Sequence, residues 1–289
     1  MLGYMSARSP TIRERRLARE LRRLRETSAS MGLEEAADQL GWSKAKLSRV
    51  ETGVRRVAPA EVRQILTLYG VCGPRSDALV SFARTTRQRG WWDAYTHSLP
   101  TDYATYIGLE AEAEWLNSYT MGLVHGLMQT EAYTYQVTKS ILMRLSPPSD
   151  VEKRVAARLA RQKAWLEREA PVRLWSILDE TALKRIIGSP EVMREQYLHI
   201  LRLADTANVM FQVMPLEAGA HPGVVGSFTV VGFPERFTPD VVYVENMTSA
   251  LYIEDEREVH SYSLAFEQMQ AMALSPADSL TMLERLARR

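Results

Sequence analysis

The stretch LEEAADQLGWSKAKLSRVETG, from Leu33 to Gly53, is the part of this sequence that most constrains the fold. Apolar residues recur at helical spacing on both sides of Gly41, and a glycine there permits the positive φ that ends a helix sharply. Ser43 is a suitable N-cap for a second helix, which Gly53 ends. The stretch therefore predicts two short helices joined by a tight turn.

The second of these helices has an apolar face and a basic face. Leu47 and Val50 face inward, and the small side chains of the preceding helix allow a close approach. The outward side chains are Ser43, Lys44, Ala45, Lys46, Ser48 and Arg49. A helix of this kind fits the major groove of DNA, and a structural hairpin with a solvated basic face is the alternative interpretation.

Each outward side chain suits a particular part of a DNA duplex. Lys44 and Arg49 can donate to guanine O6 and N7, and Ala45 can contact a thymine methyl group. The Ser43 hydroxyl and the Lys46 ammonium are better suited to phosphates. We therefore expect Lys44, Ala45 and Arg49 to contact bases. Ser43 and Lys46 are expected to contact the DNA backbone.

Three further helices are expected in residues 1–90, which would make this part an all-α domain of five helices. The first follows a capping box over residues 11–14 and carries arginines on its outer faces. The others are predicted over 60–69 and 76–88, and the last of them would link this domain to the rest of the chain.

Charge is unevenly distributed along the chain, although the net charge is only +1. Residues 1–90 carry 18 lysines and arginines against 9 aspartates and glutamates, so residues 91–289 carry 18 against 26. A basic part followed by an acidic part indicates a polyanionic partner for the first part alone. The composition changes after Gly90, so we place the boundary between two domains there, at 1–90 and 91–289.

The pattern after residue 90 alternates between helices and strands. Helices are predicted over 130–145, 150–169, 180–187, 190–205, 255–273 and 276–288. Strands are predicted over 113–120, 172–178, 208–214, 225–232, 240–246 and 250–253. The sequence therefore predicts an α+β fold class, in which one mostly antiparallel sheet is covered by helices.

Residues 91–289 contain little that indicates catalysis. The motifs GxxxxGK[ST], GxGxxG and GxSxG do not occur, and the histidines lack metal-ligand spacing. Glu110, Glu112 and Glu114 alternate, so on a strand they would share one face, as a solvated edge or as a cation or acid–base site. We expect no catalytic residue, no metal and no cofactor.

Two features of this second domain indicate binding. The loop GAHPGVVGSF contains His221 and Gly223 and is a candidate regulatory loop, although a tight turn with a packed histidine is the alternative. Aromatic residues are also concentrated in this domain, and they line a ligand pocket, line a peptide groove or form the core. They are Trp91, Trp92, Tyr95, Tyr103, Tyr106, Trp115, Tyr119, Trp165 and Trp175.

The segment AADQLGWSKAKLSRVETG resembles the helix-turn-helix of Xre/Cro-type repressors, and the resemblance spans residues 11–72. The shared features are the small residue, the Leu-Gly turn, the Ser N-cap and the Ser-Arg-aliphatic-Glu-x-Gly ending. The resemblance implies a DNA-binding protein. Proteins in which each subunit binds one half of a palindromic DNA site are expected to act as homodimers. The resemblance gives structural roles to Gly41, Leu47, Val50, Glu51 and Gly53.

The same resemblance implies roles for three arginines. In this family the glutamate of the third helix usually pairs with an arginine of the first, so Arg25 is the expected partner of Glu51. The loop after the third helix tends to meet the DNA backbone, so Arg55 and Arg56 are expected to contact phosphates.

The second domain resembles the C-terminal domain of WhiJ-like actinomycete regulators in the segments GLMQTEAY, RLARQKAWL and VMFQVMPLEAGAHPGVVGSFTVVGF. These regulators pair that domain with an Xre-type helix-turn-helix, and some are described as toxin–antitoxin-like. The resemblance implies a regulator of development or secondary metabolism, with a small protein partner encoded nearby. Family members commonly have PGLLQT where this chain has HGLMQT, from His125 to Thr130.

Three classes of function fit these observations. A DNA-binding repressor controlled by a small protein, which we favour, predicts an exposed apolar patch. The same regulator controlled by a small molecule predicts a pocket of roughly 300–1,000 Å³, and a DNA-tethered enzyme predicts titrating residues in a cleft. One cysteine, Cys72, and the lack of a long apolar run lead us to expect a cytoplasmic protein without a membrane segment.

Overall fold

The computed structural model describes residues 12–85, 99, 101–142, 147–234 and 240–288. The chain divides into two compact units, residues 1–90 and residues 91–289. The expected α+β class is confirmed, with an all-helical first unit and a second unit built on one sheet.

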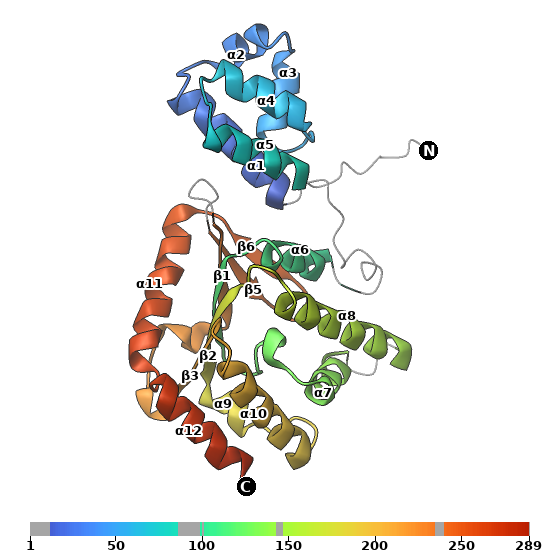
Figure 1. Cartoon of the computed structure of the whole chain (residues 1–289), viewed down its shortest axis with the longest axis vertical. Coiled ribbons are helices and arrows are strands. Elements are labelled where there is room, and N and C mark those ends of the chain that lie inside the picture. The colour runs from blue at the N-terminus through green and yellow to red at the C-terminus, as the bar shows by residue number, and fades with distance from the viewer. Residues whose placement is uncertain (1–11, 86–98, 100, 143–146, 235–239, 289) are drawn as a thin grey trace. The chain divides into compact units, whose positions relative to one another are not determined.

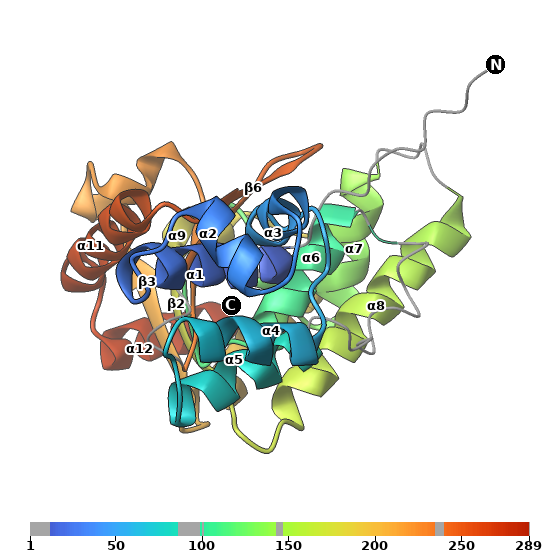
Figure 2. The ribbon, with the colours of Figure 1, turned by 90° about the horizontal axis from the view of Figure 1, so that it is seen from above.

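The first unit is a cluster of short helices, and the five that were expected are present among its described residues. They are α1 (Ile12–Thr27), α2 (Leu33–Gln39), α3 (Lys44–Glu51), α4 (Pro59–Leu68) and α5 (Pro74–Thr85). Figure 2 shows α3 beside α1 and α2, which both contact it. The capping box expected over residues 11–14 includes Thr11, which lies outside the described residues.

Local chemistry explains where α3 begins and ends. The Ser43 hydroxyl accepts a hydrogen bond from the Lys46 backbone N–H at 3.2 Å, as an N-cap does. Gly41 has φ +66°, and Gly53 has φ +74°. A Cβ atom on Gly53 would also lie 3.4 Å from the Arg15 backbone, so glycine lets α3 end directly against α1.

The second unit is built on a six-stranded mixed sheet. Its strands are β1 (Trp115–Thr120), β2 (Arg173–Asp179), β3 (Val209–Met214), β4 (Phe228–Gly232), β5 (Val241–Glu245) and β6 (Ala250–Ile253). Their order is β3-β2-β1-β4-β5-β6. The pairings of β1, β2 and β3 are parallel, and the three that involve β4, β5 and β6 are antiparallel. Every strand predicted from the sequence is therefore present.

Helices cover both faces of this sheet. They are α6 (Thr101–Glu110), α7 (Glu131–Ile141), α8 (Pro148–Leu166), α9 (Glu180–Lys184), α10 (Pro190–Ala204), α11 (Glu256–Met272) and α12 (Pro276–Ala287), with 3-10 turns at Gly126–Met128, Leu216–Ala218 and Pro222–Val225. Figure 1 shows α11 on one face and α6, α8 and α10 on the other. Phe266 and Met269 of α11 pack against Tyr119 and Phe228 in the main core.

The outer edge of β3 is covered by the C-terminal part of the chain. Val213 donates its backbone N–H to the Ser279 hydroxyl at 2.9 Å, and its carbonyl accepts from the Leu274 N–H at 2.9 Å. Ser279 lies in α12 and Leu274 lies just before it, so this part of the chain occupies backbone groups that another strand would use.

Helix α6 was not predicted from the sequence, and it changes the interpretation of the alternating glutamates. Glu110 is the last residue of α6, Glu112 lies in a turn, and Glu114 precedes β1. The three carboxylates therefore do not share a strand face, and a site built from that alternation is ruled out. Among the described residues, no helix has the length and apolar character needed to cross a bilayer.

Candidate functional site

The outward face of α3 is exposed as the sequence predicted. Ser43, Lys44, Ala45 and Arg49 are exposed, whereas the inward residues of this helix are fully buried. The Arg49 guanidinium donates from Nε to the Ala45 carbonyl at 3.2 Å and pairs with no carboxylate among the described residues. Arg49 therefore offers charged N–H groups on a surface that a DNA groove can reach.

The cations expected to contact phosphates are already paired with carboxylates. Lys46 Nζ lies 3.0 Å from Glu61 Oε1, and Arg55 Nη2 lies 3.1 Å from the same oxygen. The Lys46 ammonium also lies 3.5 Å from the centre of the Trp42 ring. Arg56 pairs in the same way with Glu14. Phosphate binding by these residues therefore competes with their own carboxylates.

Glu61 acts as the centre of this cluster because its second oxygen has a structural role. Glu61 Oε2 accepts the Ala58 N–H at 3.0 Å, at the start of α4. Partial burial would raise the pKa of the Glu61 carboxyl, but this bond and the nearby Lys46 and Arg55 together lower that pKa below its ordinary value. The carboxylate therefore stays charged and offsets part of the positive charge of Lys46 and Arg55.

The ion pair expected between Arg25 and Glu51 is present and buried. Arg25 donates from Nε and from Nη2 to the Glu51 carboxylate, at 2.9 Å in each case, and from Nη1 to the Met31 carbonyl at 2.8 Å. Tyr69 of the α4 C-terminus also donates to Glu51, at 3.4 Å. These bonds tie the ends of α1, α3 and α4 together.

The second unit contains a cavity of about 580 Å³. Its wall is largely aromatic, made of Tyr103, Tyr106, Tyr119, Phe228 and Tyr243. The floor is the segment from Gly122 to Gln129, which follows β1. Gln162 of α8 holds this segment in place, because its amide donates to the Gly126 and Gln129 carbonyls at 2.8 Å and 2.9 Å.

The topology of the sheet explains why a cavity lies there. Tyr119 near the end of β1 is paired with Phe228 at the start of β4. The chain leaves β1 toward α7 and α8, whereas the segment before β4 includes the turn Pro222–Val225, which contacts α11 on the opposite face. Connections that diverge to opposite faces leave a crevice at the strand ends, where α/β proteins commonly bind ligands.

The polar end of the cavity is formed by α8 and the segment after β1. Arg158 Nη1 donates to the Gln129 side chain at 2.9 Å. His125 is buried, and its Nδ1 accepts the Leu127 N–H at 3.4 Å. Burial, with help from Arg161 and Arg158, lowers the pKa of His125 to about 3, so the imidazole is neutral near pH 7.

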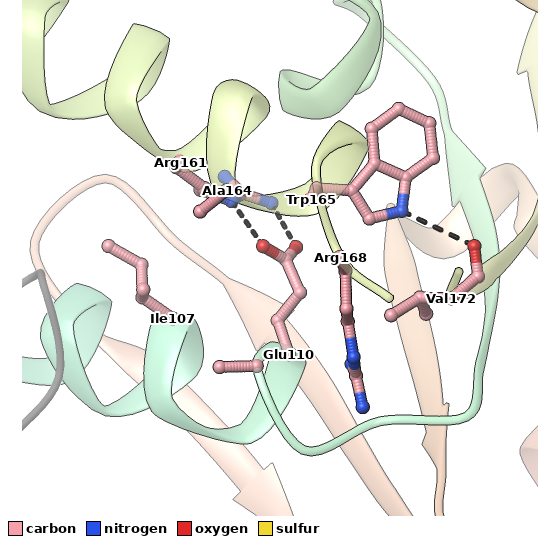
Figure 3. Close-up of a pocket in the computed structure, with 8 residues that line it drawn as sticks. Ile107, Glu110, Arg161, Ala164, Trp165, Arg168 and Val172 are labelled. Carbon is pink, nitrogen blue, oxygen red and sulfur yellow. Dashed lines mark hydrogen bonds and ion pairs between the residues drawn. The ribbon is translucent and has the colours of Figure 1, made fainter. Parts of the chain in front are cut away.

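A buried ion pair closes one wall of the cavity. Arg161 of α8 donates from Nε to Glu110 Oε1 at 2.7 Å and from Nη1 to the Tyr103 hydroxyl at 2.7 Å. Behind this pair lies a smaller cavity of about 250 Å³, lined by Trp165 and Arg168 as well. Figure 3 shows the Glu110 carboxylate facing the Arg161 guanidinium, with the Trp165 indole bonded instead to the Val172 carbonyl.

These arginines change the acidity of a tyrosine beside them. Burial alone would raise the pKa of the Tyr103 hydroxyl, but Arg161 and Arg158 lower it more, to a value below the ordinary one. The same burial would lower the pKa of the Arg161 guanidinium, yet Glu110 raises it well above its ordinary value. The charges at the polar end of the cavity are therefore the two guanidinium groups and the buried Glu110 carboxylate.

The candidate regulatory loop is packed against the cavity wall. His221 is buried beside Asp179, and its Nδ1 accepts the Gly223 N–H at 3.2 Å. A Cβ atom on Gly223 would collide with the Tyr119 ring and lie 2.7 Å from Met269 Sδ. Tyr119 lines the cavity and donates to Asp179 at 3.0 Å, so the loop and the cavity share a side chain.

Sequence reasoning missed most of the residues that form this cavity. Arg158 and Arg161 both lie in the segment RLARQKAWL. The available signal for a functional role was their three-residue spacing, which places both arginines on an otherwise apolar helix face. Several of the aromatic residues singled out are in the wall, whereas Trp91, Trp92 and Tyr95 lie outside the described residues. In the described parts of the chain, no three histidine, cysteine, aspartate or glutamate side chains are placed to hold a metal ion.

Comparison with known proteins identifies both units. Residues 16–79 match a helix-turn-helix domain family, and residues 103–285 match a domain of unknown function, DUF5753. No curated protein and no solved structure matches the chain. The helix-turn-helix match fits a DNA-binding regulator and covers α2 and α3 completely. Because the second match spans more than half of the sequence, the chain belongs to the DUF5753 family, joined here to an N-terminal helix-turn-helix domain.

Proposed function

We propose that this protein is a sequence-specific transcription regulator that reads DNA with α3. The observation that carries the proposal is the exposed basic face of α3 within a matched helix-turn-helix domain, with Arg49 free of any carboxylate among the described residues. Lys44, Ala45 and Arg49 contact bases in this proposal. Ser43, Lys46, Arg55 and Arg56 contact the backbone, the three cations after exchanging their carboxylates for phosphates.

The proposed regulator acts as a homodimer and represses transcription. Two copies of α3 would enter successive major grooves about 34 Å apart, on a pseudo-palindromic site near the regulator's own promoter. The basic balance of residues 1–90 supports a DNA partner for this unit. The sequence resemblance to Xre/Cro-type repressors supports both the dimer and the direction of regulation.

The second unit supplies the regulatory input. Its resemblance to WhiJ-like regulators supports a small protein partner, and Val225 and Met247, which are 91% and 75% exposed, offer apolar contacts for one. The cavity of about 580 Å³ specifically favours the alternative input, a small molecule, because its volume lies within the usual range for ligand pockets. The loop containing His221 and Gly223 contacts Tyr119. In this proposal, that contact transmits the signal of either the protein partner or the small molecule.

Binding to the DNA upstream of the protein's own gene tests the DNA-reading part of this proposal. The full chain is titrated onto that duplex and onto a scrambled duplex over a range of salt concentrations. A steep salt dependence with affinity about 10³-fold higher for the native duplex is expected. Equal affinity for the two duplexes, or no binding at low salt, would overturn sequence-specific reading by α3.

A further inference from the structure

We propose that the 580 Å³ cavity of the second unit binds a flat, mostly apolar molecule that carries one anionic oxygen group, with Arg158 holding the anion. This inference deepens the ligand-controlled form of the proposed function, because it names the chemical class of the ligand. It concerns the second unit alone and needs no contact with DNA.

The aromatic wall explains why the body of the ligand is flat and apolar. The rings of Tyr106 and Tyr243 are stacked, with centroids 4.0 Å apart and planes at 21°. Tyr119 and Phe228 extend the wall, with centroids 6.3 Å apart. A wall lined by these aromatic rings favours a planar hydrophobic group, which can pack against ring edges and faces.

The charge balance of the cavity explains why the ligand is an anion. The charged residues that line it are Arg158, Arg161 and Glu245. Arg161 is neutralised by its buried pair with Glu110, and Glu245 is exposed at the end of β5. Arg158 is half-buried and fixed by Gln129, and no carboxylate among the described residues pairs with it. A half-buried guanidinium without a carboxylate partner is a good receptor for one carboxylate-like group.

Neutral hydrogen-bonding groups complete the receptor for an oxygen anion. Because His125 Nδ1 accepts the Leu127 N–H, the neutral imidazole carries its proton on Nε2, which donates to no group among the described residues. Thr120 Oγ1 is buried and has no partner in the described parts of the chain. Both residues line the cavity, and the buried Thr120 hydroxyl is costly to leave unsatisfied unless a ligand or water bonds to it.

These features also exclude some classes of ligand. A nucleotide with several phosphates would bring more negative charge than one unpaired arginine compensates. A cationic ligand would meet the Arg158 guanidinium, and the one carboxylate that lines the cavity, Glu245, is exposed to solvent. A single anionic group on an aromatic body is the class that satisfies both ends of the cavity.

Two fluorescent probes with the same body test this inference. 8-Anilinonaphthalene-1-sulfonate carries one sulfonate, and N-phenyl-1-naphthylamine has the same rings without it. Each is titrated onto the full chain in the absence of DNA. We expect one site per chain and an affinity at least tenfold higher for the sulfonate, because a charge-assisted bond to Arg158 adds to the shared stacking. Equal affinities for the two probes would overturn the assignment of an anion site.

Three variants separate the cavity from other apolar surfaces. Arg158→Met keeps an apolar stem and should reduce sulfonate binding about tenfold while binding of the neutral probe is unchanged. Arg154→Met, one turn earlier on α8 and not part of the cavity lining, removes the same charge and should change neither affinity. Ser140→Trp, at an exposed position that lines the cavity, should weaken both probes.

The controls make every outcome decisive. Unchanged sulfonate binding in Arg158→Met, or equal losses in Arg154→Met and Arg158→Met, would contradict a specific role for Arg158. Unchanged binding of both probes in Ser140→Trp would place them outside the cavity and overturn the proposal. Circular dichroism and the unfolding midpoint verify that each variant is folded. Because no DNA is present, failure here leaves the DNA-reading proposal intact, and failure of DNA reading leaves this one intact.

Discussion

The guanidinium of Arg25 lies 2.9 Å from the carboxylate of Glu51, and both side chains are buried in the first unit. The pair joins the last turn of α1 to the end of α3. Its hydrogen bond and Coulomb attraction raise the pKa of Arg25 above the ordinary value against the opposing effect of burial. The orientation of α3 therefore depends on a contact that lies away from its exposed face.

Glu51→Gln should destabilise the first unit without touching the DNA-facing side chains. Removing one partner of a buried pair leaves the other charge uncompensated, so we expect the free energy of unfolding to fall by about 3 kcal/mol. Urea unfolding of the full chain, followed by circular dichroism, measures this loss. Arg22→Gln, which removes one partner of an exposed pair with Glu26 and does not contact Glu51, is the control and should leave the midpoint in place. An equal effect of both variants would contradict a special role for Glu51.

Arg49→Ala and Arg55→Ala should weaken DNA binding in different ways. Loss of Arg49 removes a proposed base contact, so it should cost about 1–3 kcal/mol on the preferred duplex and little on a scrambled one. Loss of Arg55 removes a phosphate contact and should weaken both duplexes alike. Competition binding with the two duplexes distinguishes these patterns. If Arg49→Ala reduced the affinity for both duplexes equally, its assignment to a base would be wrong.

Glu61→Gln should strengthen DNA binding. The amide oxygen can still accept the Ala58 N–H, while Lys46 and Arg55 lose the carboxylate that competes with phosphate. We expect tighter binding to every duplex and a steeper dependence on salt, by about one or two phosphate contacts. The slope of log affinity against log salt measures the change. Glu34→Gln instead removes the carboxylate that pairs with the exposed Lys44, which is assigned to a base. This variant tests whether the change in salt dependence is specific to the cluster of Glu61, Lys46 and Arg55. A weaker or unchanged slope in Glu61→Gln would disprove the competition.

His125 should make the stability of the second unit sensitive to acid. Its pKa is about 3 in the folded protein and about 6.5 when unfolded, so the unfolded chain binds more protons between these values. The contribution of His125 to the free energy of unfolding is therefore fully present above pH 6.5. It is lost as the pH falls toward 3, by up to about 1.4 kcal/mol per pH unit. Urea unfolding at pH 7, 6 and 5 should give a shallower loss for His125→Asn than for the wild type. The exposed His260→Asn is the matched control, and identical slopes in all three proteins would falsify the role of His125.

Gly223→Ala should disturb the cavity through Tyr119. A new methyl group would overlap the Tyr119 ring and crowd Met269, so we expect a destabilisation of about 1–3 kcal/mol. The displaced ring should also weaken binding of both naphthyl probes. Gly122→Ala is the matched control for stability, because a Cβ atom there meets nothing within 4 Å. Wild-type stability and probe binding in Gly223→Ala would show that the loop tolerates the added volume.

Local signals were sufficient to predict most of the secondary structure. Ser43, Ser189 and Ser275 act as N-caps where the sequence placed helix starts, because a hydroxyl that satisfies a free N–H works through neighbouring residues only. Helix α6 gave no such signal. Its residues from Tyr106 to Glu110 are all buried, so it lacks the polar face on which a helical period depends.

Contacts between distant segments could not be predicted in the same way. Glu110 and Arg161 are 51 positions apart, and nothing in either neighbourhood indicates their pairing. The cavity combines α6, the segment after β1, α8, β4 and β5, so it emerges only when the sheet is assembled. The Arg25–Glu51 pair was anticipated because the family resemblance, rather than the local pattern, contains that long-range information.

The cover that α12 provides over β3 has a consequence for the behaviour of the protein in solution. A bare edge strand is a template to which a strand of another molecule can add, and repeated addition produces fibres. Leu274 and Ser279 occupy the backbone groups of Val213 that such an addition would use. We therefore expect Leu274 and α12 to protect this edge from strand addition, and a chain shortened before Leu274 to assemble through its sheet.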